Sequence, residues 1–486
     1  MSATTRTPER LAVWCTELEL TDRPGGLVPP PGRTTERARV LLRLHGRVLG
    51  IVEVPAGPSH LVAEVLLAGL GPAGAARLAD ELAECVTEGC VEDPAAPLHA
   101  HPRLRGEADA DAPLVTVVIC TRDRADQLVT CLATLRRQDH PAMEVVVVDN
   151  APSDDATQVA FGSAVGDDRR FRYVREDVPG VSAARNRGLA EAHGGIVAYT
   201  DDDVHVDSSW VSATARAFAE HPAAACVTSL VCARTLDTPA ERFFDDRVSW
   251  SLACEPRTYT PLEATEPLHP FAAGAFGTGA GMAFRTSVLR DLGGFDELLG
   301  AGTPTRGGED LDAFARVLLA GHELHYEPSA VVWHSHRADL PSLRKQMLGY
   351  GSGLSAYLTK HLLDEHSRRL MLARVPRGVA HYARGARRVV GHEDVATATA
   401  PGAPRSTGGI DGATTGGHGL PTTGLLAREL AGLAVGPLWY LRAARRRRRD
   451  AAPTPPPPPR PPPPAAPAPG RAGRAPVPPP ATPEVA

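Results

Sequence analysis

Cysteine is sparse in this chain of 486 residues and follows no regular spacing. The eight cysteines contain no CxxC pair, and they are too dilute for the disulfide framework of a small secreted protein. A reduced compartment is therefore the simplest interpretation of their use.

Long apolar runs and a strong net charge are missing as well. No stretch reaches 18 apolar residues, and the first six residues lack the apolar core of a signal peptide. The 52 basic and 57 acidic residues leave a formal charge of −5, which gives no indication of nucleic-acid binding. We expect a cytoplasmic protein without a transmembrane span. A peripheral position at the inner face of the cell membrane is compatible with this expectation.

What the chain does contain is a run of three carboxylates behind an apolar segment. Residues 196–199 predict a buried strand, and Asp201, Asp202 and Asp203 follow it. Because side chains alternate along an extended segment, Asp201 and Asp203 should face one way and Asp202 the other. Two aligned carboxylates repel each other unless a cation lies between them, and such oxygen ligands suit Mg²⁺ or Mn²⁺. A solvated acidic turn is the alternative for the triplet alone.

Two earlier apolar segments, residues 115–120 and 144–150, alternate with helical patterns. Continuous apolar strands between helices predict an α/β protein whose mostly parallel sheet is covered on both faces. The polar turn 121–124, Asp149 and the aspartate triplet would then stand at three strand ends on one rim. Ligands of open α/β sheets bind at that rim.

Three later segments carry further polar groups. Residues 276–285 alternate glycines with apolar residues, and these glycines favour close approach of the backbone to a ligand. Glu309 and Asp310 open a predicted helix, and His334 and His336 stand at the end of a predicted last strand. Taken singly, each of these groups could be an ordinary surface or helix-capping residue.

In this order the motifs resemble those of the family 2 glycosyltransferases, inverting enzymes with the GT-A fold. The resemblance covers residues 114–345 and rests on CTRDR at 120–124, VVDN at 147–150, AARNRG at 183–188, TDDD at 200–203, GTGAGMAFR at 277–285, GGFD at 293–296, GED at 308–310 and WHSHR at 333–337. The chain departs from the family at Asp123, where Asn is usual, and both side chains accept hydrogen bonds.

The resemblance implies a role for each candidate site residue. Asp310 would be the catalytic base, with Glu309 as the alternative for that role. The metal ligands would be Asp203, Asp201 and His334, with His336 left open as a substitute for His334. Contacts to the nucleotide sugar are implied for Thr121, Arg122, Arg124, Asp149, Arg185, Asp201, Asp202 and Gly279. Without the resemblance, Asp149 could equally cap the next helix.

The expected activity is transfer of a sugar, with inversion, from a nucleotide-diphosphate sugar to an acceptor hydroxyl. A divalent metal, Mg²⁺ or Mn²⁺, is the expected cofactor. The expected partners are a nucleotide-sugar donor and a glycan or lipid-linked acceptor of cell-envelope, exopolysaccharide or glycolipid synthesis, with no nucleic acid. The alternatives are a nucleotidyltransferase on a similar fold and a non-catalytic nucleotide-sugar-binding scaffold. The turn 121–124 has neither the glycine nor the lysine that a nucleotidyltransferase would need there.

The remaining parts of the chain surround the catalytic domain expected over residues 112–345. Residues 1–110 predict an accessory α+β module with a hairpin (38–44 and 48–54) and a helix (73–86). We expect a basic helical extension (346–391), a flexible linker (392–424) and a proline-rich disordered tail (450–486). Residues 425–449 predict an amphipathic helix with a polybasic end. That helix either lies on a membrane surface or docks on the protein itself.

Overall fold

The computed structural model describes residues 12–20, 29–30, 32–33, 35–56, 66, 68–87, 112–248, 253–261, 268–374, 376 and 422–450. The predicted linker up to residue 421, most of 375–391 and the tail beyond residue 450 lie outside the described residues.

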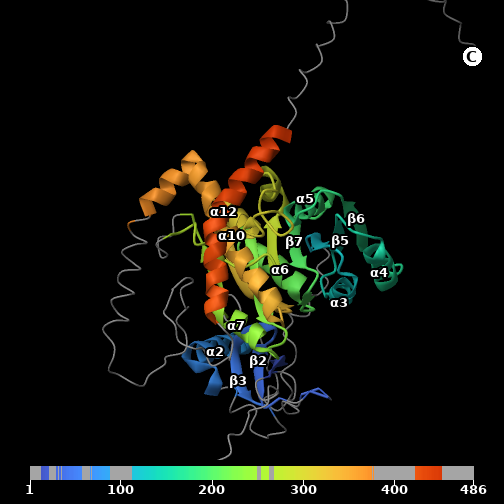
Figure 1. Cartoon of the computed structure of the whole chain (residues 1–486). Helices are drawn as coiled ribbons and strands as arrows, with labels where there is room; N and C mark the ends of the chain where they lie inside the picture. Colours follow the sequence, from blue (N-terminus) through green and yellow to red (C-terminus); the bar gives the residue numbers. More distant parts are fainter. Residues whose placement is uncertain are drawn as a thin grey trace, which may run out of the picture. The chain divides into compact units, whose positions relative to one another are not determined.

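A nine-stranded mixed sheet carries the larger part of the described chain (Figure 1). Its strands follow the order β10-β12-β9-β11-β7-β4-β5-β6, and β8 pairs with β12. Strands β7, β4, β5 and β6 are mutually parallel, as are β9 and β12, whereas β11 runs antiparallel between β7 and β9. The strands are β4 (Val115–Thr121), β5 (Met143–Asn150), β6 (Phe171–Glu176), β7 (Ile196–Asp201), β8 (Val204–Val206), β9 (Ala224–Ala233), β10 (Arg257–Tyr259), β11 (Gly281–Arg285) and β12 (Glu323–His334).

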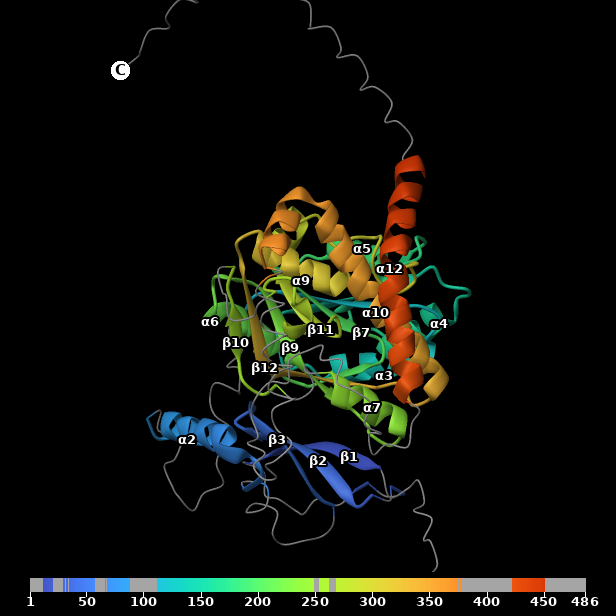
Figure 2. The same ribbon diagram turned by 60° about the vertical axis from the view of Figure 1, so that its left-hand side comes forward.

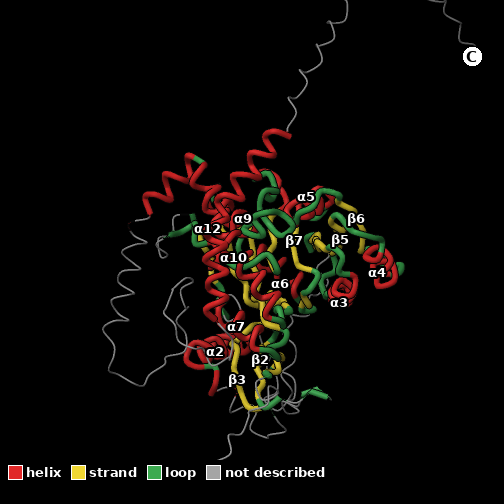
Figure 3. The backbone as a smooth tube through the Cα atoms, in the orientation of Figure 1, coloured by secondary structure: helices red, strands yellow, loops and turns green. Residues whose placement is uncertain are grey.

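Helices cover both faces of this sheet (Figure 3). Side chains of alternate positions on the central strands divide between two cores, because successive residues of a strand point to opposite faces. Val118 and Tyr199 pack with α5 and α9 on one face, and Val117 and Ala198 pack with α3 and α6 on the other. The predicted α/β class is confirmed. The helices are α3 (Ala125–Leu135), α4 (Ala156–Val165), α5 (Val181–Glu191), α6 (Trp210–Glu220), α7 (Pro239–Arg247), α8 (Thr286–Asp291), α9 (Glu309–Leu319), α10 (Leu340–Leu363), α12 (Thr422–Asp450) and the short 3₁₀ turn η2 (Ala273–Ala275).

In its described residues, the N-terminal module contains a three-stranded sheet and the helix α2 (Figure 2). It contains β1 (Val13–Glu19), the predicted hairpin β2 (Arg37–Leu44) and β3 (Arg47–Pro55), and the predicted helix α2 (Gly71–Thr87). Strand β1, which the sequence did not reveal, pairs in parallel with β2. Leu41 and Val48 of the hairpin join the core of the catalytic domain. The Arg43 guanidinium also lies 3.0 Å from the carboxylate of Asp207. The module is therefore packed on the catalytic domain through both apolar and charged contacts.

Helix α12 docks on α10, which is one of the two alternatives left open by the sequence (Figures 1 and 2). Gly351 of α10 and Gly432 of α12 lie in close backbone contact with the facing helix, since a Cβ atom on Gly432 would come 2.8 Å from the Ser352 amide nitrogen. Leu425 is buried with Leu343 and Met347 of α10. The buried positions of α12 include Leu425, Gly432 and Tyr440, whereas Leu430 and Leu438 are exposed. Membrane contact stays a prediction. Among the described helices, none combines the length and hydropathy required to cross a bilayer.

Replacing Gly432 with alanine is expected to weaken this docking. In a free helix the change would stabilise by about 1 kcal/mol. Here the added methyl group has no room against α10, and overpacking of this kind costs about 1–3 kcal/mol. We expect a lower midpoint of thermal unfolding and faster proteolysis of α12. The matched control is Gly424→Ala, where the added Cβ meets nothing within 4 Å. Equal behaviour of the two variants would contradict the close packing.

Candidate active site

Three neighbouring parallel strands bring the predicted polar groups to one rim of the sheet. Strand β4 lies between β5 and β7, so that Thr121 pairs with Asp149 and Cys120 pairs with Asp201. The carboxyl ends of β4, β5 and β7 therefore meet as expected from the sequence. Because the strands are parallel and in register, residues far apart in the chain are neighbours here.

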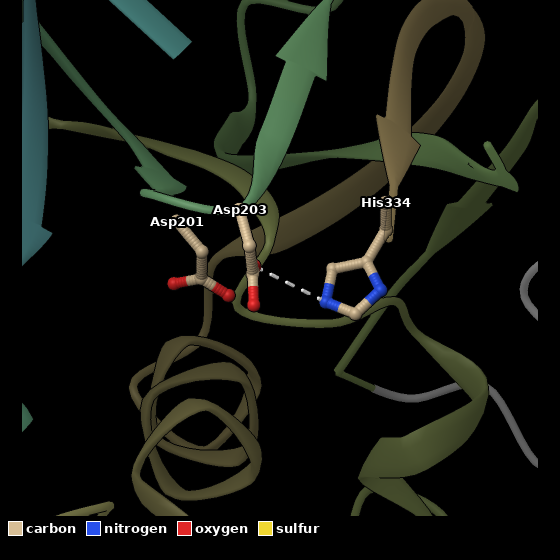
Figure 4. A group of neighbouring side chains, drawn as sticks. All are labelled: Asp201, Asp203 and His334. Atoms are coloured by element: carbon tan, nitrogen blue, oxygen red, sulfur yellow. Dashed lines mark ion pairs between the residues drawn. The ribbon is translucent and has the colours of Figure 1, made fainter. Parts of the chain in front are cut away.

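Asp201, Asp203 and His334 form a cluster that could hold a metal ion (Figure 4). One ligand atom from each residue lies within 4.8 Å of the others. Strand β12 pairs with β8 so that His334 stands opposite Val204, directly after the triplet. This pairing leaves the His334 Nε2 atom 3.5 Å from the Asp203 Oδ1 atom. His336 lies behind His334 rather than in the cluster, since its Nδ1 atom is 3.2 Å from the Nδ1 atom of His334.

The electrostatics of the three residues differ. Burial raises the pKa of Asp201 to about 6, because the opposing effect of Arg185 is smaller. The nearby Asp203 carboxylate raises this pKa further. Although burial opposes ionisation of Asp203, three neighbours lower its pKa, namely His334, which is charged only at low pH, and the guanidinium groups of Arg337 and Arg124. Burial lowers the pKa of His334 to about 4, so that its imidazole is neutral near pH 7. The cluster thus presents carboxylate oxygens and one neutral ring nitrogen.

This donor set fits a divalent cation. Carboxylate oxygens suit Mg²⁺ and Mn²⁺, and an imidazole nitrogen is a common ligand of transition metals. Three protein ligands leave coordination positions for water or phosphate oxygens. Bringing two carboxylates together at a strand end is otherwise unfavourable because like charges repel.

Asp202 lies in the turn between β7 and β8, outside this cluster, and binds protein groups. Its carboxylate accepts a 2.8 Å hydrogen bond from the Thr121 hydroxyl and another of 2.8 Å from the Arg124 guanidinium. Arg124 also reaches Asp203 at 3.3 Å. Thr121, Arg124 and Asp202 therefore hold the two strand ends together. Arg337, which sequence analysis did not single out, lies 3.4 Å from Asp203 and belongs to the quoted motif at 333–337.

Arg185 connects the cluster of Asp201, Asp203 and His334 to the start of α9. Its buried guanidinium donates a 2.9 Å hydrogen bond to Glu309 and lies 3.5 Å from Asp201. Burial and the adjacent Asp310 carboxylate, opposed by Arg185, raise the pKa of Glu309 to about 7. Arg185 is thus a buried ion-pair partner rather than a solvated helix residue.

Asp310 and Gly279 meet at the same edge. The Gly279 amide donates a 2.9 Å hydrogen bond to the Asp310 Oδ2 atom, and the Leu311 amide donates one of 2.8 Å to its Oδ1 atom. A side chain at Gly279 would collide with Arg185, because a Cβ atom there would lie 2.7 Å from the Arg185 Nη2 atom. The glycine therefore allows the backbone to approach both charged groups.

Asp149 lies at the other end of the rim and does not cap a helix. Its Oδ2 atom accepts a 2.7 Å hydrogen bond from the Tyr173 hydroxyl, whereas its Oδ1 atom is buried and has no hydrogen-bond partner among the described residues. Burial raises its pKa. An unsatisfied buried carboxylate oxygen is costly and is typical of a ligand contact. Tyr173 was missed by sequence analysis. Arg122 is exposed, and Asp123, with φ 53°, accepts two hydrogen bonds from Ser153.

The proteins to which this chain is similar include glycosyltransferases. The family model Glycosyl transferase family 2 matches residues 116–293. Pre-mycofactocin glycosyltransferase of Mycobacterium tuberculosis is 29% identical over 263 residues, which are 54% of this chain and 51% of that protein. Glucosyl-dolichyl phosphate glucuronosyltransferase of Haloferax volcanii is 24% identical over 187 residues, which are 37% of this chain and 56% of that protein.

The chain spans about half the length of the curated relatives it matches. Among solved structures, a mannosyltransferase from Pyrobaculum calidifontis in complex with GDP-Man and Mn²⁺ aligns with a TM-score of 0.38 and 21% identity. That alignment covers 70% of this chain and 88% of the other. Residues 116–293, which the family model matches, contain the aspartate triplet and the strand β7 that leads into it. Residues 116–293 of this chain therefore match glycosyl transferase family 2.

Proposed function

We propose that this protein is an inverting, metal-dependent glycosyltransferase that moves a sugar from a nucleotide-diphosphate sugar to an acceptor hydroxyl. The observation that carries the proposal is the cluster of Asp201, Asp203 and His334, joined through Arg185 to Glu309 at the start of α9. The match of residues 116–293 to glycosyl transferase family 2 gives no support to the nucleotidyltransferase or scaffold alternatives.

The donor would lie along the rim formed by β4, β5 and β7. The unsatisfied Oδ1 atom of Asp149 is suited to accept a hydrogen bond from an N–H group of the nucleobase. Exposed Arg122 is suited to contact the nucleotide. A divalent cation held by Asp201, Asp203 and His334 would neutralise the diphosphate leaving group. The imidazole in the ligand set favours Mn²⁺ over Mg²⁺.

In this mechanism Asp310 accepts the proton of the acceptor hydroxyl while the hydroxyl oxygen attacks the anomeric carbon. The new C–O bond forms as the bond to the diphosphate breaks, and the diphosphate leaves with the electron pair. Backbone amides of Gly279 and Leu311 fix the orientation of the Asp310 carboxylate. Glu309 is buried and accepts a hydrogen bond from Arg185. This bond positions the arginine between Asp201 and the start of α9. Attack opposite the leaving group inverts the anomeric configuration.

The acceptor is proposed to be anionic, such as a lipid-linked or glycan acceptor carrying phosphate. A pocket of about 430 Å³ lies between α10, α12 and the loop that precedes α9. Four of its six lining residues are cations, namely Arg306, Arg344, Lys345 and Arg428. Arg306 stands three residues before Glu309, adopts the left-handed φ of 65° and stacks on Trp439 of α12. The cations of this pocket, whose Arg306 stands four residues before Asp310, would attract an anionic acceptor.

A panel of nucleotide sugars tests the proposed activity. We expect the purified protein to release nucleoside diphosphate from one donor when Mn²⁺ is present, and Asp149→Asn to weaken binding of that donor. Adding a phosphate-bearing lipid acceptor should increase turnover more than adding its neutral analogue. A protein that turns over no donor with any of these acceptors would contradict the proposal.

A further inference from the structure

A series of buried side chains in contact runs from the cluster of Asp201, Asp203 and His334 to the N-terminal module. The Nδ1 atom of His334 lies 3.2 Å from the Nδ1 atom of His336, and the Nε2 atom of His336 lies 3.4 Å from the Asp245 Oδ1 atom. The other carboxylate oxygen of Asp245 accepts a hydrogen bond from Arg39 of β2. His336 and Asp245 are 5% and 1% exposed, so water is excluded from these contacts.

The end of this series that lies farthest from His334 is Arg39, which is fixed within the N-terminal sheet. Both Arg39 Nε and Arg39 Nη2 donate to Glu53 of β3, at 2.9 and 2.7 Å, which leaves Nη1 for Asp245. Strands β2 and β3 pair Arg39 directly with Glu53. Both nitrogens donate to the same Glu53 oxygen, Oε1, and the two hydrogen bonds together set the direction of the guanidinium plane. The hairpin therefore presents one N–H group in a defined direction to Asp245.

The donors and acceptors in this series define the position of each ring proton. An ionised carboxylate can only accept, so the Nε2 atom of His336 must carry the proton that faces Asp245. When the ring of His336 carries one proton, at Nε2, its Nδ1 atom is an acceptor, and the Nδ1 atom of His334 donates to it. This leaves the Nε2 atom of His334 without a proton. That atom is the one 3.5 Å from Asp203.

We propose that Asp245, held by Arg39 and Glu53, is a positioning residue that fixes the tautomer of His334 for metal binding. The N-terminal module thereby takes part in the metal site through a contact between residues 206 positions apart in the chain. This inference rests on the proposed metal site. It assigns a role to the module beyond packing, because a ring nitrogen can bind a cation only when it carries no proton.

Two variants and one matched control test the proposal. Asp245→Asn can donate from its amide to the Nε2 atom of His336, which reverses the proton order and places a proton on the Nε2 atom of His334. Arg39→Ala removes the contact that orients Asp245. The control is Arg37→Ala, because Arg37 binds the same Glu53 at 2.6 Å from an exposed position without contacting Asp245. Both test variants should weaken Mn²⁺ binding by about 10–100-fold, the usual effect of losing an outer-shell partner.

Mn²⁺ binding is measured by electron paramagnetic resonance titration of the full chain, and folding by near-UV circular dichroism. Ring tautomers are read without metal by two-dimensional NMR of protein labelled with ¹⁵N-histidine, with His334→Gln identifying the relevant signals. Wild type and Arg37→Ala should show His334 protonated at Nδ1, whereas Asp245→Asn should shift the proton towards Nε2. Unchanged tautomer and Mn²⁺ affinity in folded Asp245→Asn and Arg39→Ala would overturn the inference. Equal losses in Arg39→Ala and Arg37→Ala would overturn it too.

The tautomer measurement separates this inference from the proposed function. Wild-type protein that binds no Mn²⁺ but holds His334 protonated at Nδ1 would contradict the metal site and leave the proton order intact. Should Asp245→Asn fail to fold, Arg39→Ala and its rescue by Arg39→Lys, which restores a cation to Asp245, provide the same comparison.

Discussion

Replacing Asp203 with alanine is expected to reduce sugar transfer by about 10³-fold or more, the scale on which loss of charge stabilisation at a leaving group acts. Of the two carboxylates in the cluster, Asp203 has a lowered pKa and Asp201 a raised one, so Asp203 is the more fully ionised near neutral pH. Its carboxylate lies 3.5 Å from His334. Its loss removes one of three protein ligands and leaves Arg124 and Arg337 without this shared partner. The developing charge on the diphosphate would then lack its counter-ion.

The measurement is turnover of the best donor with and without a chelator. Wild-type protein in excess EDTA should fall to the level of Asp203→Ala, and added Mn²⁺ should restore only the wild type. Asp202→Asn serves as the control, since Asp202 binds Thr121 and Arg124 and lies outside the ligand cluster. We expect the turnover of Asp202→Asn to be lost in EDTA and restored by added Mn²⁺, as in the wild type. Full wild-type activity in chelator would rule out metal dependence.

Replacing Asp310 with asparagine should lower turnover by about 10²–10⁴-fold while leaving donor binding intact, because a general base contributes on this scale. The Asp310 carboxylate is oriented by two backbone amides and is not paired with a cation in the described part of the chain. The acceptor hydroxyl is a weak nucleophile until its proton is removed. Calorimetry of donor binding separates a loss of chemistry from a loss of folding.

Glu309→Gln should have a much smaller effect than Asp310→Asn. Glu309 is buried and hydrogen-bonded to Arg185, and with its pKa raised to about 7 it is largely protonated at mildly acidic pH. Glutamine resembles that neutral form, so the variant should approach wild-type turnover below pH 7 and diverge above it, where the wild-type carboxylate ionises. Greater loss in Glu309→Gln than in Asp310→Asn would reassign the base. A product that retains its anomeric configuration would contradict the inverting mechanism.

The amino-acid sequence by itself determined the catalytic fold and the location of the site. Apolar runs of strand length ending in Thr121, Asp149 and Asp201 were sufficient, because parallel strands necessarily bring their carboxyl ends to one rim. Strand alternation likewise predicted that Asp202 would face away from Asp201 and Asp203. Both inferences depend on local geometry, which repeats every two residues and is therefore visible in the sequence.

Only the tertiary structure decided which partners these groups have. The choice between His334 and His336 follows from pairing of β12 with β8, and the contact of Arg39 with Asp245 joins residues 206 positions apart. An apolar helix face carries no mark of what covers it, so the sequence left docking and membrane binding of residues 425–441 equally open. Close approach at Gly351 and Gly432 shows that this helix docks on α10, and membrane binding stays a prediction. Such choices depend on the shape of a second surface, and periodicity within one segment contains no information about that surface.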